Sequence, residues 1–272
     1  MKKTRILLIR RKRLFPLSLF ILLAAVCAAG FFFTRTPPET AEAFSGEFMW
    51  YYIPQEAGEP PQPMEKAEYI GNYRILYLGK TEEKVIYLTF DDCPENQNIP
   101  AILDILEEHG ITAAFFMNET YIRKYPEVVR RAVDAGCLIC NHTAHHVSVT
   151  RLSFSKFKAE LRGVEEAYRD VTGKELSRFF RPPQGLFTET TLGYAQELGY
   201  TTVFWSFSYD DWNEFAQLSA SRAISIVMKE THPGEIALFH CQSRTNLKIL
   251  DGVITAWSEA GYSFGSLEDL AD

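Results

Sequence analysis

The sequence is poor in cysteine and histidine, and it contains no internal repeat and no low-complexity tract. Its 272 residues include five cysteines and six histidines. Five cysteines form no obvious disulfide framework for a domain of this length. Cys137 and Cys140 have the C-x-x-C spacing, but they lie in an apolar segment without a second pair, so we expect buried thiols rather than a zinc knuckle. The length allows one large domain with appendages or two small domains.

Acidic residues are absent from the first 13 positions, which carry seven Lys or Arg residues. Residues 14–33 then form an uncharged apolar run long enough to cross a bilayer. A basic flank before an apolar segment predicts a single-pass cell-membrane protein whose C-terminal part is extracytoplasmic. Ala41-Glu42-Ala43 has the small-x-small pattern of a cleavage site but lies well beyond the apolar run. We therefore predict an uncleaved signal anchor, with secretion after cleavage as the alternative.

The charge balance argues against two classes of partner. The formal net charge is −7, and the basic head contributes +7 to it, so the rest of the chain carries −14. An acidic body disfavours nucleic acid and anionic lipid surfaces as partners. Contact with the membrane is expected through the N-terminal helix, and the protein is expected to be a monomer.

Composition divides the chain into four parts. We predict a basic cytoplasmic head at 1–13, a transmembrane anchor at 14–33, a stem at 34–62 that is rich in Pro, Glu and Gly, and the main domain at 63–272. The stem contains an aromatic cluster, Phe48-Met49-Trp50-Tyr51-Tyr52, which we expect to dock on the main domain.

Strands and amphipathic helices alternate from residue 85 onward. The expected strands are 85–90, 112–116, 137–140, 179–181, 202–205 and 236–240, and the expected helices are 99–108, 125–135, 153–171, 188–198 and 220–230. Repeated βα units of this length predict an α/β fold with a parallel sheet, closed as a barrel.

Two adjacent carboxylates, Asp91 and Asp92, directly follow the strand expected at 85–90. Adjacent acids repel each other, so a nearby cation favours such a pair. Alone, the pair is more typical of a solvated turn in which one aspartate caps the next helix. A second cluster further along the chain changes this interpretation.

Three of the six histidines lie within residues 141–146, after another expected strand. His142 and His146 can face one cation from a short turn, whereas the role of His145 is ambiguous. Two imidazoles and one carboxylate suit Zn²⁺ or a similar divalent metal. Asp92 could supply the carboxylate, which leaves Asp91 as a base beside the metal.

Polar residues also follow the other expected strands. These residues are Arg181, Asp210, Asp211 and His240. The carboxyl ends of parallel strands in a barrel converge on one face, so residues at these positions can share one site. We therefore expect the acids, the histidine cluster, Arg181 and His240 to lie together.

Five short motifs occur in this order: Thr89-Phe90-Asp91-Asp92, His142-Thr143-x-x-His146, Arg181-Pro182-Pro183-x-Gly185, Asp211-Trp212 and Leu238-x-His240. Together they resemble the motifs of the polysaccharide deacetylase family, which is carbohydrate esterase family 4 with the NodB-type domain. The resemblance covers roughly residues 84–270. It implies a distorted, incomplete (β/α) barrel with parallel strands and a metal-dependent hydrolase that removes N- or O-acetyl groups from sugars.

Within that family the chain looks most like the delta-lactam-biosynthetic de-N-acetylases, which act on muramic acid in peptidoglycan. The likeness lies in residues 77–84, 93–96 and 204–212. It implies de-N-acetylation of N-acetylmuramic acid in the cell-wall glycan, as a step toward muramic delta-lactam. Two alternatives stay open. One is deacetylation of N-acetylglucosamine in peptidoglycan or chitin-type glycans, or of acetylxylan, and the other is a non-catalytic glycan-binding module.

The resemblance implies a role for each residue of the site. Asp92, His142 and His146 would hold one divalent metal ion and leave positions open for a water and the acetyl oxygen. Zn²⁺ is the first expectation, and Co²⁺ or Mn²⁺ also suits these ligands. Asp91 would take a proton from the water, and Arg181 would orient Asp91 and keep it ionised.

The remaining motif residues would complete the reaction and the pocket. His240 would protonate the departing amine, and Asp211 would hold its ring and raise its pKa. A backbone N–H near Gln184 would stabilise the oxyanion together with the metal. Trp212 and Leu238 would wall the acetyl pocket, although ordinary core positions explain these two residues equally well.

Two positions depart from the family pattern. Cys93 stands where the family has glycine, and a cysteine adopts the left-handed backbone of a tight turn only at a cost. We therefore expect the turn after Asp92 to be built around a packed Cys93 side chain. Ser208 replaces an acid that often precedes the Asp-Trp pair, so the support of His240 rests on Asp211.

Overall fold

The computed structural model describes residues 46–64, 67–91 and 98–270. Outside these residues lie the predicted head at 1–13, the predicted anchor at 14–33, Asp92 of the first motif, and Cys93, which follows that motif. In the described part of the chain, no helix combines the length and the apolar character needed to cross a bilayer. The described residues belong to one compact unit, Ser45–Asp272.

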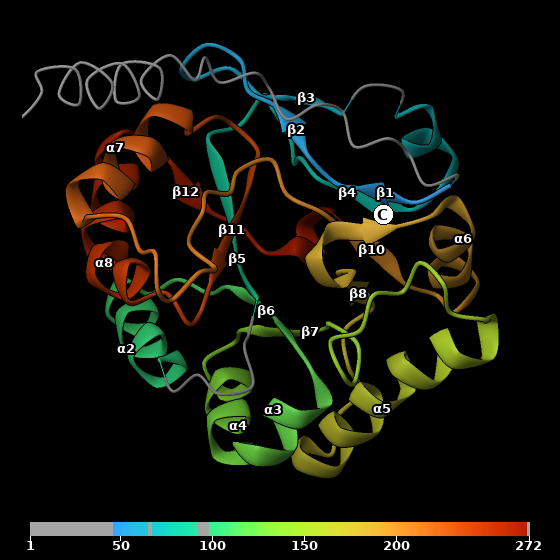
Figure 1. Ribbon diagram of the computed structural model, residues 1–272. Coiled ribbons are helices and arrows are strands. Elements are labelled where there is room, and N and C mark those ends of the chain that lie inside the picture. Colours follow the sequence, from blue (N-terminus) through green and yellow to red (C-terminus); the bar gives the residue numbers. More distant parts are fainter. Residues whose placement is uncertain (1–45, 65–66, 92–97, 271–272) are drawn as a thin grey trace, which may run out of the picture. The chain divides into compact units, whose positions relative to one another are not determined.

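A parallel sheet forms the centre of this unit (Figure 1). The strands lie in the order β11, β5, β6, β7, β8, β10 and β4, and β12 pairs with β5. All of these pairs are parallel. The bounds are β4 (Ile75–Leu76), β5 (Val85–Asp91), β6 (Ala114–Met117), β7 (Leu138–Asn141), β8 (Phe179–Phe180), β10 (Thr201–Val203), β11 (Glu235–His240) and β12 (Ser263–Phe264).

The sheet is a half-barrel, as the family resemblance implied. Its two ends, β4 and β11, are not joined by a ladder, and the connection near them is an isolated antiparallel bridge between Leu78 and Glu235. The closed barrel predicted from the βα repeats alone is therefore wrong. Strand periodicity specifies the units but not the pairing of the first strand with the last.

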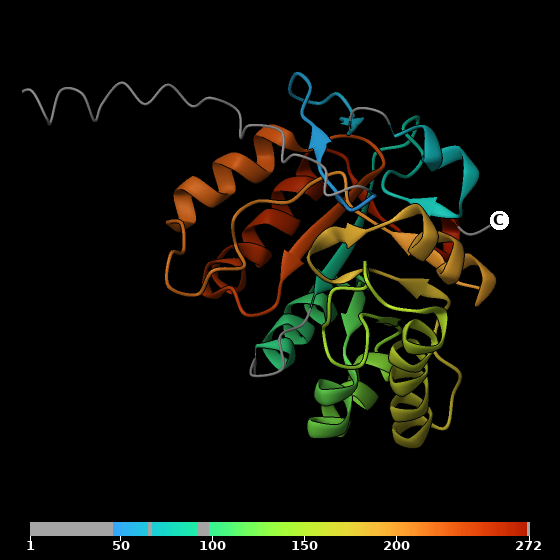
Figure 2. The same ribbon diagram turned by 45° about the vertical axis from the view of Figure 1, so that its right-hand side comes forward.

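Helices cover the outer face of the half-barrel (Figures 1 and 2). Their bounds are α2 (Ile99–His109), α3 (Glu119–Lys124), α4 (Pro126–Asp134), α5 (Phe154–Thr172), α6 (Glu189–Glu197), α7 (Ala220–Glu230) and α8 (Arg244–Glu259), with short 3-10 turns η1 (Glu68–Asn72), η2 (Pro183–Gly185) and η3 (Leu267–Leu270). Ile86, Leu88 and Phe90 of β5 face these helices and are buried among apolar residues of α2 and α8. Burial of this face is the main stabilising contribution to the fold.

The predicted strands and helices are present to within a few residues. Helix α5 ends at Gly173, whose φ of 72° is a conformation that glycine adopts without strain. Helix α8 was not predicted, although Ser243 caps it by accepting a hydrogen bond from the Asn246 backbone N–H at 3.0 Å. The short helix α3 and the two-residue strands β4 and β12 were also missed.

Residues 46–64, most of which were assigned to the predicted stem, pack on the sheet domain. Strand β1 (Phe48–Met49) pairs antiparallel with β9 (Leu186–Phe187), and β2 (Tyr52–Ile53) pairs with β3 (Gln62–Pro63). Trp50 is buried, and its ring stacks on Phe204 with centroids 4.5 Å apart. The expected docking of the aromatic cluster is confirmed, and the described part of the predicted stem belongs to the domain.

A carboxyl group is fully buried at the first position of β11. Oε2 of Glu235 accepts a hydrogen bond from the His232 backbone N–H at 3.1 Å, while Oε1 has no hydrogen-bond partner among the described residues. The His232 ring is also buried and bonds to Ser206 Oγ at 2.9 Å. Burial raises the pKa of Glu235 well above its usual value.

The raised pKa of Glu235 predicts a specific pH dependence of stability. A carboxyl whose pKa is higher in the folded chain stabilises the fold below its unfolded pKa of about 4.3, and this contribution is lost as the pH rises through the folded pKa. The free energy of unfolding of Glu235→Gln should therefore rise relative to that of wild type above about pH 4.3, by about 1.4 kcal/mol for each pH unit, until the pH passes the folded pKa of Glu235. Denaturant unfolding between pH 4 and 9 measures this difference.

The matched control is Glu166→Gln, since Glu166 is exposed on α5. Its unfolding free energy should follow the wild-type pH profile. Parallel profiles for Glu235→Gln and wild type would show that the carboxyl ionises at its ordinary pH in the fold.

Candidate functional site

Strand alternation brings four motif residues to one face of the sheet. Asp91, His142, Arg181 and His240 stand at or just beyond the carboxyl ends of β5, β7, β8 and β11. Each lies two or four positions after a buried apolar residue of the same strand. These apolar residues are Tyr87, Cys140, Phe179 and Ile236, and they belong to one cluster on the inner side of the half-barrel. Side chains two apart on a strand share a face, so all four belong to the inner side of the half-barrel. The register also pairs His240 with Asp91 directly.

The centre of the site is a buried ion pair between Arg181 and Asp91. Nη1 of Arg181 donates to Oδ1 of Asp91 at 2.7 Å, and Arg181 is fully buried. Burial alone would raise the pKa of Asp91, but the Arg181 guanidinium, together with His142 and His240, outweighs burial and holds that pKa below its usual value. Asp91 is therefore a carboxylate at neutral pH.

Further hydrogen bonds fix the guanidinium. Arg181 donates from Nε to the Val203 carbonyl at 3.1 Å, and from Nη2 to Thr89 Oγ1 at 3.0 Å and to the Phe204 carbonyl at 3.1 Å. Its carbon Cζ lies 4.0 Å from the centroid of the Phe116 ring. A guanidinium with this many fixed donors cannot turn away from Asp91 without leaving buried polar groups unpaired.

Two imidazoles lie next to Asp91. The ring centroids of His142 and His146 are 4.9 Å apart, and Nε2 of His142 is 3.6 Å from Oδ2 of Asp91. Nδ1 of His142 lies 2.8 Å from the Arg181 carbonyl oxygen, so this nitrogen carries the proton and donates. Burial lowers the pKa of His142 to about 4 and also lowers that of His146. Both rings are therefore neutral near pH 7, with lone pairs available to a metal.

A strained turn places these imidazoles. Thr143 and His146 have φ values of 64° and 53°, in the left-handed region that non-glycine residues seldom occupy. Asn141 stabilises the turn from inside the core: Oδ1 accepts from the Thr143 N–H at 3.0 Å, and Nδ2 donates to the Leu161 carbonyl at 2.9 Å. Such strain is typical of functional sites.

The donor set fits a divalent metal ion. Neutral imidazoles are common ligands of such ions, and a backbone carbonyl that fixes the tautomer of a ligating histidine is a usual companion. Among the residues that the structure describes, no group of three or more His, Cys, Asp or Glu side chains is arranged to hold a metal. The predicted third ligand, Asp92, lies outside those residues. His145 is exposed and pairs with Glu160 at 3.0 Å instead.

His240 and Asp211 form a second pair in the site. Nδ1 of His240 lies 2.7 Å from Oδ1 of the buried Asp211, whose Oδ2 accepts the His240 backbone N–H at 2.8 Å. The Asn246 amide also donates to Oδ2 of Asp211. Burial alone would lower the pKa of His240, but the carboxylates of Asp211 and, to a smaller extent, Asp91 together outweigh burial and raise that pKa. Nδ1 is the bonded nitrogen, so Nε2 is the one that can exchange a proton with a ligand.

The three residues predicted to line the pocket differ in their surroundings. Gln184 is exposed in the turn η2 with φ of 61°. Leu238 is buried on the inner face, two residues before His240. Trp212 is 59% exposed, so it is not an ordinary core residue.

No role was predicted for two buried polar residues of the site, Thr89 of the first motif and Asn246. Thr89 stands two residues before Asp91 on the same face, and its Oγ1 donates to the Ala237 carbonyl at 2.7 Å while accepting from Arg181. Asn246, at the start of α8, bonds to Asp211. Strand periodicity could have identified Thr89, because a threonine inside an apolar strand needs a partner. Asn246 had no such signal, since α8 itself was not predicted.

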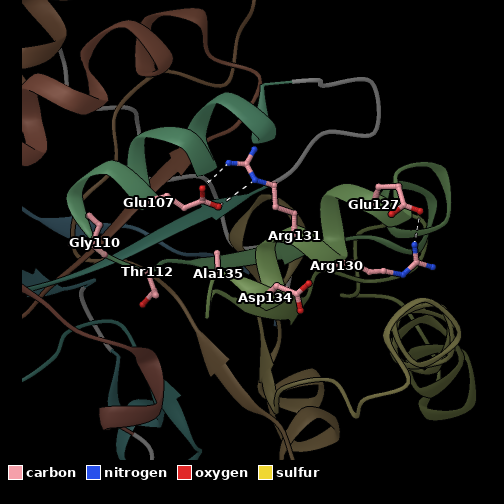
Figure 3. A pocket seen from close by; sticks show the side chains of 9 residues that line it. Glu107, Gly110, Thr112, Glu127, Arg130, Arg131, Asp134 and Ala135 are labelled. Carbon is pink, nitrogen blue, oxygen red and sulfur yellow. Dashed lines mark hydrogen bonds and ion pairs between the residues drawn. The ribbon is translucent and has the colours of Figure 1, made fainter.

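A hollow of about 780 Å³ lies elsewhere, between α2 and α4 (Figure 3). Gly110 and Thr112 on its wall precede β6, and Ala135 precedes β7. It therefore opens at the amino ends of these strands, opposite the candidate site. Its arginines are already paired, Arg131 with Glu107 at 3.0 Å for example, and we assign no chemistry to it.

Comparison with known proteins identifies the family. A sequence model described as polysaccharide deacetylase matches residues 78–203. The chain is 38% identical over 232 residues to the peptidoglycan-N-acetylmuramic acid deacetylase PdaA of Bacillus subtilis, covering 85% of this chain and 88% of that protein. The chain belongs to the polysaccharide deacetylase family.

Solved structures of polysaccharide deacetylases share the fold. That of Bacillus subtilis PdaA, a family 4 carbohydrate esterase, superposes with a TM-score of 0.79 at 37% identity, over 82% of this chain and 96% of that one. A family 4 carbohydrate esterase from Bacillus anthracis superposes with a TM-score of 0.67 at 34% identity, over 81% of this chain and 98% of that one.

A further relative by sequence is a peptidoglycan-N-acetylglucosamine deacetylase of Bacillus cereus. The two sequences are 28% identical, and the match covers 74% of this chain and 74% of that protein. This chain is therefore a hydrolase of amide bonds in carbohydrates. Polysaccharide deacetylases as a family are generally metal-dependent.

Loss of Arg181 should destabilise the fold strongly. Arg181→Met leaves the buried Asp91 without its partner, and removal of one member of a buried ion pair costs about 3–5 kcal/mol. Arg130→Met is the matched control, since Arg130 pairs with Glu127 on the surface at 2.6 Å and such pairs contribute about 0–1 kcal/mol. Denaturant unfolding at pH 7 compares the two, and equal losses would contradict a buried, mutually dependent pair.

Proposed function

We propose that this protein de-N-acetylates amino sugars of peptidoglycan, with N-acetylmuramic acid as the substrate and muramic delta-lactam as the later product. The observation that carries the chemistry is an ionised, Arg181-bound Asp91 next to two neutral imidazoles, with the His240–Asp211 pair beside it. The choice of sugar is supported by the 38% identity to a muramic acid deacetylase over most of both chains.

The proposed cofactor is one divalent metal ion at His142, His146 and Asp92, with Zn²⁺ before Co²⁺ or Mn²⁺. When bound, such an ion lowers the pKa of a water and polarises the acetyl carbonyl. The protein prepares the site for it by keeping both imidazoles neutral and by fixing the His142 tautomer through the Arg181 carbonyl.

Asp91 is the proposed general base. Its Oδ1 is held by Arg181, so Oδ2, which faces His142, is the oxygen that accepts a proton from the attacking water. The lowered pKa keeps this oxygen unprotonated at neutral pH. Arg181 thus orients the base and keeps it charged without touching the substrate.

His240 is the proposed general acid. Asp211 holds Nδ1 and raises the pKa, so Nε2 carries a proton that it can deliver to the departing amine nitrogen. Bond cleavage then leaves the free amine on the sugar and acetate as the second product. A backbone N–H near Gln184 is proposed to stabilise the oxyanion, with Leu238 and Trp212 beside the acetyl group.

Deacetylation of N-acetylglucosamine is the second candidate function. It is supported by the relative from Bacillus cereus, whose name gives that substrate. Asp91, Arg181 and His240 suit either sugar, because the chemistry at the acetyl group is the same. Chitin-type glycans and acetylxylan are further substrates for the same test.

We also propose that the protein acts outside the cytoplasm. The proposal rests on the basic residues within 1–13 and the uncharged apolar run at 14–33. These residues would form a cytoplasmic head and a single-pass anchor, followed by a linker and the catalytic domain, here as a monomer. Cleavage of the N-terminal segment would instead give a secreted form.

Replacement of the proposed base should strongly reduce turnover without loss of the metal. Asp91→Asn keeps the shape of the side chain but removes its basicity, so acetate release from purified peptidoglycan should fall by about 10²–10⁴-fold. Elemental analysis should find the same metal content as in wild type, and circular dichroism should find the same fold. Asp134→Asn, at an exposed position on α4, is the control and should keep full activity.

Unchanged acetate release by Asp91→Asn would remove Asp91 from the role of base. Absence of acetate release from every glycan by the metal-loaded wild type would contradict the enzyme itself and would fit the glycan-binding alternative.

The alkaline limb of the pH–rate profile should depend on Asp211. The acid must be protonated to act, so activity falls as the pH rises through the pKa of His240. Asp211→Asn removes the charge that raises this pKa, so the limb of kcat should move to lower pH by about 1–3 units. Asp210→Asn makes the same charge change at the exposed neighbouring residue and should leave the limb in place. A limb that does not move in Asp211→Asn would exclude His240 as the titrating acid.

A further inference from the structure

The turn η2 has a backbone conformation that needs outside support. Gln184 and Gly185 follow each other with φ values of 61° and 66°. A non-glycine residue in this region is strained and persists only where the surroundings fix it. Within the turn, the Gly185 N–H donates to the Pro182 carbonyl at 3.0 Å.

The main external contact to this turn comes from residue 50, far away in the sequence. The Trp50 backbone N–H donates to the Gly185 carbonyl at 2.8 Å, directly after the pairing of Phe48 and Met49 with β9. The approach is close: a Cβ atom added to Gly185 would lie 3.4 Å from the Trp50 Cβ and 2.8 Å from the Trp205 ring. Glycine is required here by space as well as by its backbone angle.

The Trp50 side chain is itself held on the strand end that supports Arg181. Its ring is parallel to that of Phe204 at an angle of 9°, and Nε1 donates to the Trp205 carbonyl at 2.9 Å. The Phe204 carbonyl accepts from Arg181, and the Trp205 ring lies 5.7 Å from the Arg181 guanidinium. Trp50 therefore connects the turn to the residues around the catalytic carboxylate.

We propose that Trp50 is a positioning residue that holds the Gln184–Gly185 turn in the geometry needed to stabilise the oxyanion. The inference rests on the proposed function, in which a backbone N–H near Gln184 acts on that oxyanion. Because such a donor is used in the transition state more than in the substrate complex, a loosened turn reduces kcat and leaves KM nearly unchanged. Removal of one such donor altogether costs about 10²–10³-fold in kcat.

The test compares three variants of the full chain. Trp50→Ala should lower kcat by about 10-fold or more, with KM within about 2-fold of wild type. Trp50→Phe keeps an aromatic ring on Phe204 but loses the bond to the Trp205 carbonyl, so its kcat should be intermediate. Phe48→Ala is the control. It removes a ring that lies against Phe187 and Tyr69, with centroids 5.5 and 5.6 Å away. The Trp50 ring and its bond to the Trp205 carbonyl stay in place, so this variant should lower Tm while preserving kcat.

Hydrogen exchange of the Gly185 amide gives a readout independent of turnover. Exchange should be about 10-fold faster or more in Trp50→Ala and unchanged in Phe48→Ala, because the Gly185 N–H reports the closure of the turn. Two results would overturn the proposal. One is an equal loss of kcat in Trp50→Ala and Phe48→Ala when their Tm values are equal. The other is an unchanged exchange rate of the Gly185 amide in Trp50→Ala. An inactive wild type would contradict the proposed function, and the exchange rates would still decide whether Trp50 holds the turn.

Discussion

The buried ion pair between Arg181 and Asp91 is the interaction on which the arrangement of the site depends. A charged pair inside a protein is maintained only when hydrogen bonds satisfy its remaining polar atoms. Here those bonds come from Thr89 on β5 and from the Val203 and Phe204 carbonyls at the end of β10. The pair therefore ties strands that are distant in sequence to one fixed geometry, and it keeps Asp91 ionised inside the domain.

Other parts of the site are built on this pair. The carbonyl of Arg181 fixes the His142 ring, so the residue that orients the proposed base also orients a candidate metal ligand. On the other side, the register of β11 against β5 places His240 beside Asp91. Asp211 accepts hydrogen bonds from both the ring Nδ1 and the backbone N–H of His240. The proposed base, Asp91, thus has a lowered pKa next to a buried guanidinium, and the proposed acid, His240, has a raised pKa next to a buried carboxylate.

Strand periodicity predicted the positions of several site residues from the sequence, because polar residues at the ends of apolar strands are easily recognised. It identified Asp91, Arg181 and His240 and the parallel sheet between them. It could not predict that the barrel stays open between β4 and β11, because two-residue strands carry no periodic signal. Nor could it predict the contact of Trp50 with Gly185, which joins segments with no local relation in the chain. Asp92 lies outside the described residues, so its place in the site stays a prediction.

The function proposed for this buried site is removal of the acetyl group from N-acetylmuramic acid in peptidoglycan. Mass spectrometry of the muropeptides released after purified peptidoglycan is treated with the metal-loaded protein tests it most directly. We expect loss of acetyl mass from N-acetylmuramic acid residues, with N-acetylglucosamine residues unchanged. Acetyl loss from N-acetylglucosamine alone would contradict the proposed substrate, and an unchanged mass spectrum would contradict the proposed reaction.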